Sequence, residues 1–351
     1  MEIYLPVANV TVNLWILIAL GLFVGFLSGL LGIGGGIILN PALIKLGIPP
    51  IVTVGTSVAQ MVGATVSGFL SHLKLKNIDL KMGWIMVISG FVGGGFGVLL
   101  AKALEDAGYF RTFVLSLYTF YLGFTGITMF IDVLKKDKKE KSKNSKLKDF
   151  IQKLPFKMKF QFTEISVLVP IGIGAFAGFL AAVMGVGGGF VVIPALIYLA
   201  NFPVQKAVGM SLFQMIFVTS FLTYFHGTVN HGVDIVLALI LMAGSSFGAV
   251  FGAAVGQKMK KDHIKLIMAF LVSTVAIMSF YQLFFEKPKP KPPVEVVDNP
   301  ISHFAFNYPE IYSLTVIVIS LIAGFIISSI AHRLKILIEI YLEKIRHQKA
   351  Q

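Results

Sequence analysis

Gly32-Ile33-Gly34-Gly35-Gly36 and Gly185-Val186-Gly187-Gly188-Gly189 are two copies of one glycine-rich stretch, and each interrupts a long apolar segment. A shorter apolar segment follows each copy, and both of these contain Pro-Ala-Leu-Ile, at residues 41–44 and 194–197. Each glycine weakens a helix by about 1 kcal/mol relative to alanine. Inside a membrane, broken backbone is tolerated only where protein or a water-filled cavity surrounds it. We therefore expect the fold to be organised around the two breaks.

The duplication extends well beyond the glycines. Seven residues after the first break recur in the same order after the second, with one inserted residue: Pro50, Gly55, Ser57, Gln60, Met61, Thr65 and His72 match Pro203, Gly209, Ser211, Gln214, Met215, Thr219 and His226. The match covers roughly residues 14–134 and 166–285. So many identities indicate an internal duplication. Each half divides into five apolar segments, and one more, at 311–331, has no counterpart. The segments lie at about 14–31, 36–46, 51–73, 82–104 and 109–133 in the first half, and at about 167–185, 190–200, 204–228, 235–256 and 264–285 in the second.

The composition is that of a membrane protein. Hydrophobic residues make up 56% of the 351 and charged residues 13%, whereas soluble domains are about 45–50% apolar and about 25% charged. Apolar runs of about 20 residues, the length that crosses the hydrocarbon core of a bilayer, recur along the chain. We predict an all-α polytopic protein in the cell membrane. No cleaved signal peptide is expected, because no basic region precedes the first apolar segment, which belongs to the repeat.

Basic loops set the expected orientation. The net charge of +13 reflects lysines and arginines gathered between spans, which is typical of positive-inside topology rather than nucleic-acid binding. Placing these loops in the cytoplasm requires inverted halves, with the N-terminus outside and the C-terminus inside. The predicted organisation is a first transmembrane repeat (1–134), a basic cytoplasmic linker (135–163), a second repeat (164–286), a Pro-rich extracytoplasmic linker (287–310), an extra transmembrane helix (311–331) and a basic cytoplasmic tail (332–351).

The glycine breaks predict an anion site. A helix that resumes after a break has backbone N–H groups without an intrahelical acceptor, at the positive end of its dipole. Such an end binds anions without a charged side chain, and matching breaks in two halves are typical of a transporter's substrate site. The alternative is that the glycines merely let helices cross closely. Their density and duplication favour a site built from the amides of Gly34, Gly35, Gly36, Gly187, Gly188 and Gly189.

Polar residues follow each break. Ser57 and Gln60, like Ser211 and Gln214, are three residues apart and share one helical face. Their hydroxyl and amide donors suit oxyanion oxygens, although they could also bond neighbouring helices together. Asn40 corresponds to Ile193, so a contact from Asn40 would make the half-sites unequal. His72 and His226 occupy equivalent span ends and are candidates for anion contact or proton coupling, although histidines at span ends are more often interfacial.

Residues that several kinds of function require are absent from the sequence. No Asp or Glu lies in the middle of a span, which argues against a carboxylate proton relay or a cation site. The chain has no His-Glu-x-x-His motif and no cysteine, and we predict neither an enzyme nor a cofactor or metal site. The expected partners are a small anion and the lipid bilayer. A small-anion channel remains the alternative, since the same dipoles suit a pore.

The duplicated Gly-Phe-Leu … Gly-x-Gly-Gly-Gly … Pro-Ala-Leu pattern, followed by Gly-x-Ser and Gln, resembles the TauE/SafE family of sulfite exporters. The resemblance covers nearly the whole chain except the linker and the tail. It implies a permease that exports sulfite or an organosulfonate such as sulfoacetate across the cytoplasmic membrane. It also implies that the breaks and the polar pair after each form the substrate pocket. The unequal Asn40 position and the extra helix depart from the duplicated pattern.

Together these observations lead us to expect a secondary transporter with alternating access and an anion held at helix N-termini between inverted repeats. An uptake permease for another sulfur anion is an alternative, beside the channel. The first segments of the two halves, 14–31 and 167–185, fit either full spans or re-entrant helices. Proton coupling through the histidines is compatible with all of these readings.

Overall fold

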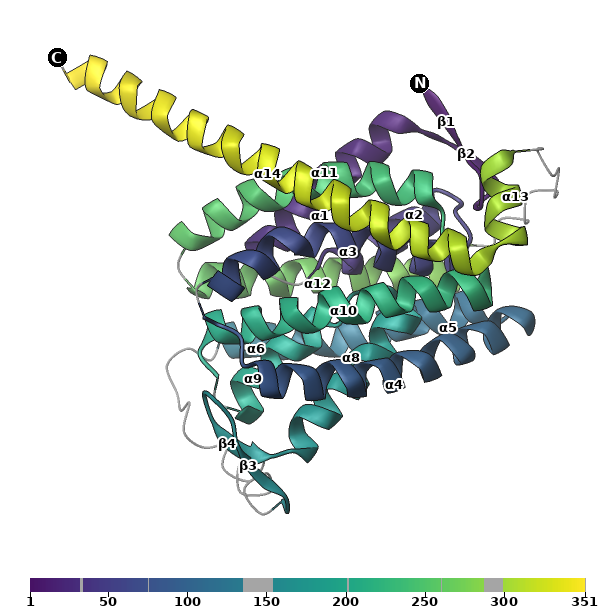
Figure 1. The fold of residues 1–351 in the computed structure, drawn as a ribbon, viewed down its shortest axis with the longest axis horizontal. Coiled ribbons are helices and arrows are strands. Elements are labelled where there is room, and N and C mark those ends of the chain that lie inside the picture. The colour runs from purple at the N-terminus through teal and green to yellow at the C-terminus, as the bar shows by residue number, and fades with distance from the viewer. Residues whose placement is uncertain are drawn as a thin grey trace.

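The computed structural model describes residues 1–31, 34–74, 76–134, 154–200, 202–259, 261–286 and 299–350. Long helices run side by side through the molecule (Figure 1). The first half comprises β1 (Glu2–Leu5), β2 (Val10–Asn13), α1 (Leu14–Leu31), α2 (Gly36–Lys45), α3 (Pro50–Lys74), α4 (Leu80–Asp106), α5 (Phe110–Leu117), the π-helix η1 (Tyr118–Leu122) and α6 (Gly123–Leu134).

The second half repeats this order. It comprises β3 (Lys157–Lys159), β4 (Glu164–Ser166), α8 (Leu168–Met184), α9 (Gly189–Ala200), α10 (Val204–Asn230), α11 (Ile235–Lys258) and α12 (Lys261–Phe284). Two more helices, α13 (Pro300–Asn307) and α14 (Pro309–Ala350), follow it. Among the described residues, 7 helices are long and apolar enough to cross a membrane, and α1, α2 and α8 are shorter apolar helices. An all-α polytopic architecture is therefore confirmed. Most of the predicted linkers, at 135–153 and 287–298, lie outside the described residues.

The first helix of each half packs on the fourth helix of the other half. Thus α1 lies against α11, and α4 lies against α8. Glycines bring the backbones together: a Cβ placed on Gly25 would lie 2.2 Å from the carbonyl oxygen of Ser245, and one on Gly178 would lie 2.1 Å from that of Gly90. Each half is therefore completed by a helix from the other.

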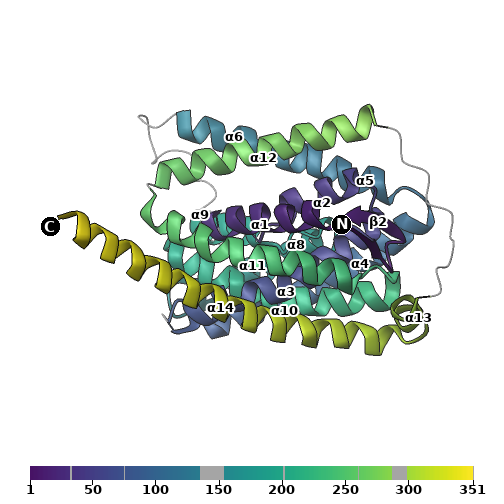
Figure 2. The ribbon, with the colours of Figure 1, turned by 90° about the horizontal axis from the view of Figure 1, so that it is seen from above.

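Equivalent helices of the two halves run antiparallel where they touch. On α3, Gly55 contacts His226 of α10, whereas Gly68 contacts Leu212, so the contact moves backward along α10 as it moves forward along α3. The same holds for α6 and α12, where Gly126 lies against Ser273 and Arg111 of α5 bonds to the carbonyl oxygen of Gln282. Figure 2 shows α6 and α12 together along one flank.

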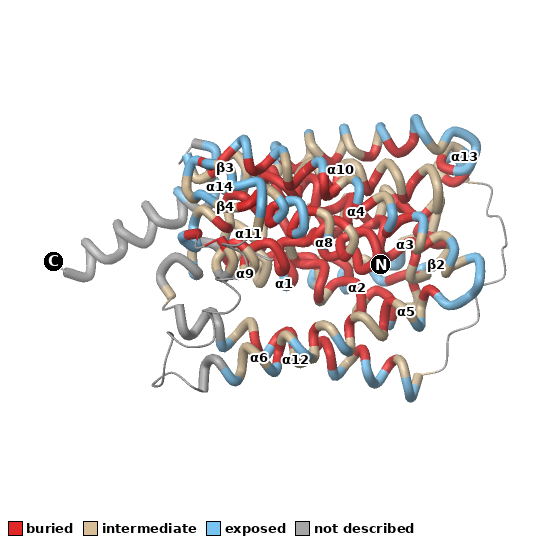
Figure 3. Tube along the Cα trace, turned by 90° about the horizontal axis from the view of Figure 1, so that it is seen from below, coloured by how far each residue is buried: buried red, intermediate tan, exposed pale blue. Residues whose placement is uncertain are grey.

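Buried residues concentrate in the middle of the molecule, whereas buried, intermediate and exposed positions mix along α6 and α12 (Figure 3). On this flank Phe124 is 71% exposed and Ile277 is 68% exposed. Apolar patches of this kind mark contact with lipid or protein. In a chain with membrane-length helices, the flank of α6 and α12 is therefore suited to contact with lipid or with another protein surface.

A short hairpin precedes the first helix of each half and docks on the opposite half. The turn of the β1–β2 hairpin donates two backbone hydrogen bonds, from Val7 and Ala8, to the buried carboxylate of Asp234, which also caps α11 through the amide of Leu237. The turn of the β3–β4 hairpin donates from Gln161 to Asp79, which caps α4. The second hairpin begins inside the stretch predicted as a linker, 135–163. Both hairpins extend the duplication beyond its sequence identities.

The last helix is longer than expected. Residues predicted as an extra span and a separate tail form one continuous α14 of 42 residues. Its length is about 63 Å at about 1.5 Å per residue, roughly twice a bilayer's hydrocarbon core. Figure 1 shows its C-terminal part projecting beyond the other helices. Only the N-terminal part of α14 can therefore lie within the hydrophobic layer.

Candidate functional site

Both glycine stretches break the chain in the same way. Gly35 caps α2 with a φ of 76°, and its counterpart Gly188 precedes α9 with a φ of 75°. This left-handed region suits glycine because it lacks a Cβ atom. Gly34 and Gly187 share the conformation, with φ of 84° and 70°. The predicted breaks between helices are therefore present in both halves.

The two breaks meet at the centre of the molecule. A Cβ atom on Gly36 would lie 2.2 Å from the carbonyl oxygen of Gly185. Two equivalent methionines, Met61 of α3 and Met215 of α10, fill the space around Gly187. Sequence positions separated by half the chain thus form one junction, as the prediction of paired breaks requires.

In the first turns of α2 and α9, some backbone N–H groups already donate to carbonyl oxygens of the preceding glycines. The amide of Gly36 donates to the carbonyl oxygen of Gly34 at 3.0 Å, and those of Ile38 and Leu39 donate to Gly35. In the second half, the amides of Val191 and Val192 donate to Gly188. The positive end of each helix still points at the junction, but Gly36 could bind an anion only by exchanging its present partner.

Asn40 joins the first break to the second. It is fully buried, and its amide donates to the carbonyl oxygens of Met184 and Gly185 and to the hydroxyl of Tyr118. Its own oxygen accepts from the hydroxyl of Ser57. In this structure Asn40 and Ser57, both predicted to contact substrate, bond to protein groups instead. Ile193, at the equivalent position, cannot form such bonds, so the two halves of the junction differ.

Tyr118 is a residue of the junction that sequence analysis did not identify. Its hydroxyl donates to the carbonyl oxygen of Met184 at 2.6 Å, and it begins the π-helix η1 between α5 and α6. Short π-helical turns often occur at functional sites because the extra residue redirects a side chain. Hydropathy predicts one regular span at 109–133, because it carries no signal for a π-helical turn.

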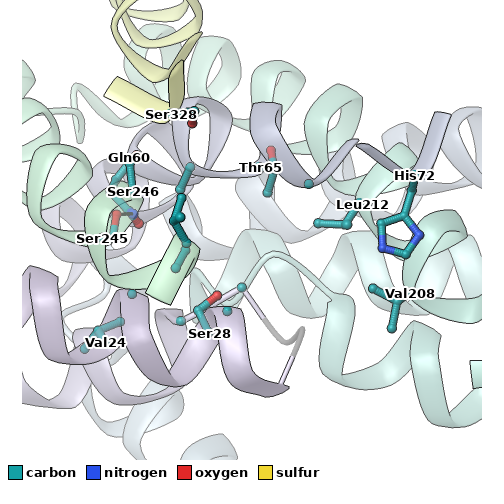
Figure 4. A pocket seen from close by; sticks show the side chains of 18 of the residues that line it. Val24, Ser28, Gln60, Thr65, His72, Val208, Leu212, Ser245, Ser246 and Ser328 are labelled. Carbon is teal, nitrogen blue, oxygen red and sulfur yellow. Dashed lines mark hydrogen bonds between the residues drawn. The ribbon is translucent and has the colours of Figure 1, made fainter. Parts of the chain in front are cut away.

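A cavity of about 290 Å³ lies beside the first break. Its wall includes four residues of the predicted site, Gly34, Gly35, Gln60 and His72. Figure 4 shows Gln60 with two serines of α11 at one end and His72 at the other. The other polar residues of the wall come from α1, α3, α11 and α14, and they are Ser28, Thr65, Ser245, Ser246, Ser328 and His332.

The described lining of this cavity mixes polar side chains with glycines and apolar residues, and it carries no Asp, Glu, Lys or Arg. Gln60 donates to the hydroxyl of Ser245. The hydroxyls of Ser246 and Ser328 are buried and have no hydrogen-bond partner among the described residues. Buried hydroxyls without partners are costly, so these two, on residues of the cavity wall, are candidates to bond a group in the cavity. The sequence missed these serines because they belong to helices far apart in the chain.

The second break is more closed. Gly187, Gly188 and Gly189 are buried, and Gln214 donates to the carbonyl oxygen of Gly174 at 3.3 Å. The hydroxyl of Ser211 and the amide oxygen of Gln214 are buried without a partner among the described residues. Gln214 thus bonds to α8, and none of these residues belongs to the wall of the cavity.

The two histidines have different surroundings. His226 is fully buried; its ring bonds to the carbonyl oxygen of Ala182 at 2.9 Å and to Asn230 at 2.9 Å, so both nitrogens are engaged. His72 borders the cavity and lies 3.3 Å from the amide of Asn77. Burial lowers the pKa of His72, and a hydrogen bond to the backbone of Gln205 partly opposes this. Burial therefore favours the neutral form of His72. Because His72 lines the cavity and His226 does not, His72 remains the stronger candidate for anion contact.

Comparison with known proteins identifies the chain. The family described as "Sulfite exporter TauE/SafE" matches residues 17–279. The chain belongs to the TauE/SafE family. It is 29% identical over 286 residues to the probable membrane transporter protein YunE of Bacillus subtilis, covering 77% of this chain and 98% of the relative. It is 28% identical over 284 residues to the probable membrane transporter protein MJ0441 of Methanocaldococcus jannaschii, covering 76% and 94%. No solved structure gives a significant match.

Membership of the TauE/SafE family confirms the resemblance and agrees with the membrane-length helices. The chain is a multi-pass membrane protein of a transporter family. The matched residues include both breaks, the junction and most of the cavity wall. They exclude α13 and α14, which are the departure from the duplicated pattern noted in the sequence.

Proposed function

We propose that this protein is a secondary transporter that exports a sulfur oxyanion, sulfite or an organosulfonate such as sulfoacetate. One observation carries the proposal: a glycine break borders a cavity whose described wall offers hydroxyl, amide and imidazole groups and no fixed charge. An anion in this cavity meets hydrogen-bond donors and the positive end of α2, which together stabilise negative charge. A resident carboxylate would repel it, and a resident lysine would hold it too firmly for turnover.

The size of the cavity suits a small anion. Pockets for drug-sized ligands span about 300–1,000 Å³, and this one, at about 290 Å³, lies at the lower end. A sulfite or a short organosulfonate fits with some of its water. The names of the relatives specify transport and not a substrate, so the sulfur anion rests on the family description and on the chemistry of the wall.

We further propose two inverted repeats and alternating access. The antiparallel contacts of α3 with α10 and of α6 with α12 support inversion, because a two-fold axis across the helices reverses equivalent elements. The cavity wall includes the exposed His332, next to the basic Arg333, while Lys76 lies in the loop after α3. The positive-inside rule makes this end cytoplasmic. The conformation is then inward-facing, and the glycines serve as hinges.

The first test is binding by the purified full-length protein in detergent. Sulfite or sulfoacetate should raise the melting temperature, whereas chloride and sodium should not, because only ligands of the folded state stabilise it. In liposomes, the same anion should exchange across the membrane with saturable kinetics. Shifts with chloride alone, or flux that never saturates, would favour a small-anion channel. Net uptake against the proposed direction would favour an uptake permease.

A matched pair of variants tests the breaks. Gly35→Leu with Gly188→Leu places side chains where φ is positive and should abolish binding of the stabilising anion. Gly95→Leu with Gly172→Leu is the control, because a Cβ at either glycine meets nothing within 4 Å. Binding retained by the first pair in a folded protein would overturn the role of the breaks.

A further inference from the structure

The N-terminal part of α14 lies against the region that carries the cavity. It contacts α3, α10 and α11, although it falls outside the residues 17–279 that define the family. A helix added only to anchor the chain in lipid would need apolar packing and no more. Its contact face instead carries small and polar residues, with Ser320, Gly324 and Ser328 one turn apart and all buried.

A pair of glycines fixes the height of α14 on α3. A Cβ atom on Gly324 would lie 2.4 Å from the carbonyl oxygen of Gly63, and one on Gly63 would lie 2.5 Å from that of Ser320. Backbones this close hold two helices in one register. One turn beyond Gly324, the same face reaches the cavity with Ser328, and a further turn brings His332 to its wall.

The hydroxyl of Ser328 behaves differently from its neighbours. Ser329, Thr315 and Ser313 on the same helix each donate to the carbonyl oxygen four residues earlier, at 2.8, 2.7 and 2.6 Å. This is how a serine or threonine in an apolar helix normally satisfies itself. Ser328 makes no such bond within the described chain, although it is only 7% exposed and lines the cavity. Its donor is therefore free for a group inside the cavity.

We propose that α14 is part of the substrate site, with Ser328 donating a hydrogen bond to the bound oxyanion and His332 lining the cavity wall opposite the glycine break. This inference rests on the proposed function, because it assumes that the cavity holds the transported anion. It assigns to α14 a role in choosing the anion: proteins built on residues 17–279 alone would lack this donor. The class of ligand is an oxyanion with at least two acceptor oxygens, one for Gln60 or the α11 serines and one for Ser328.

Cysteine accessibility tests the placement of Ser328 without knowing the anion. The chain contains no cysteine, so Ser328→Cys and Ser329→Cys each introduce a single thiol into the full-length protein. A positively charged methanethiosulfonate should modify Ser328→Cys at least about tenfold faster, because a thiol facing water ionises more readily than one facing lipid. Equal rates, or faster modification of Ser329→Cys, would overturn the proposal.

Binding then tests the donor itself. Sulfoacetate should slow modification of Ser328→Cys and leave Ser329→Cys unaffected; sulfite is unsuitable in this assay because it cleaves the mixed disulfide formed. Ser328→Ala should weaken binding of the transported anion about tenfold, the effect of losing one hydrogen bond to a charged ligand. Ser329→Ala should bind like the wild type.

The outcomes separate the two proposals. If wild-type protein binds sulfite or sulfoacetate but Ser328→Ala binds them unchanged, the role of α14 fails and the transported anion stands. If wild-type protein binds none of these anions, the proposed function fails, and the role of α14 fails with it. A shift in preference among sulfite, sulfoacetate and sulfate in Ser328→Ala, absent in Ser329→Ala, supports both proposals.

Discussion

Replacing Asn40 should loosen the junction between the two halves. Asn40→Leu keeps most of the side-chain volume but removes the amide that donates to Met184, Gly185 and Tyr118. Each net hydrogen bond contributes about 1 kcal/mol, and a buried carbonyl oxygen left without a donor costs about 1–3 kcal/mol. Met184 keeps its bond from Tyr118, but the carbonyl oxygen of Gly185 loses its donor and the hydroxyl of Ser57 loses its acceptor. We therefore expect the free energy of unfolding to fall by about 3 kcal/mol.

The assay is unfolding of the detergent-purified protein, followed for the wild type, Asn40→Leu, Tyr118→Phe and the double variant. Asn40 and Tyr118 share one hydrogen bond of 3.2 Å and both bind Met184, so their effects should not add, with a coupling of about 1 kcal/mol. Ser116→Ala is the control, because its exposed hydroxyl bonds only to its own helix. If Asn40→Leu were as stable as Ser116→Ala, or if the two losses added fully, Asn40 would not be the link described here.

Three further predictions concern other parts of the molecule. Burial lowers the pKa of His72 from its ordinary 6.5, so the unfolded chain binds the proton first and the folded state should lose stability as pH falls below about 6.5. The melting temperature of His72→Gln should fall less steeply with decreasing pH than that of the wild type. The same dependence on pH in both proteins would contradict this. Asp234→Asn should lower the free energy of unfolding by about 2 kcal/mol. The new side-chain NH2 group would replace the oxygen that accepts from the backbone N–H groups of Val7 and Ala8. Asp106→Asn, which loses only an exposed ion pair, should change it by less than about 0.5 kcal/mol, and equal effects in chemical unfolding would refute the difference. Gly324→Leu should displace α14 and weaken anion binding measured by thermal shift, whereas unaltered binding would show that the helix can move without consequence.

Much of the fold follows from local sequence. The apolar segment at 36–46 became α2 at Gly36–Lys45, and the one at 204–228 became α10 at Val204–Asn230, because helix length in a membrane is set by runs of apolar residues. Repetition of the glycine stretch predicted the breaks, and the junction of Gly36 with Gly185 agrees with that prediction. These features depend on residues close together in the chain or on identities between the halves.

What escaped prediction depends on contacts between distant segments. Ser245 and Ser328 line the cavity only because α11 packs on α1 and α14 packs on α3, and no pattern in one sequence reveals such pairings. The hairpins were missed because their strands, such as Lys157–Lys159, are too short for a recognisable alternation. The roles of Asn40 and Ser57 changed from substrate contact to internal bonding in this conformation, since sequence shows a polar group but not its partner.

The exchange of helices between the halves has a consequence for biosynthesis. The main packing partner of α1 is α11, so α1 cannot complete its packing until residues 235–258 have been made. Its glycine stripe, at Gly21, Gly25 and Gly29, must wait in the bilayer or the insertion machinery with lipid in place of protein. Neither half is a self-sufficient folding unit, and contacts this distant in sequence form slowly. The two halves are similar in sequence, but each needs a helix of the other half to complete its packing.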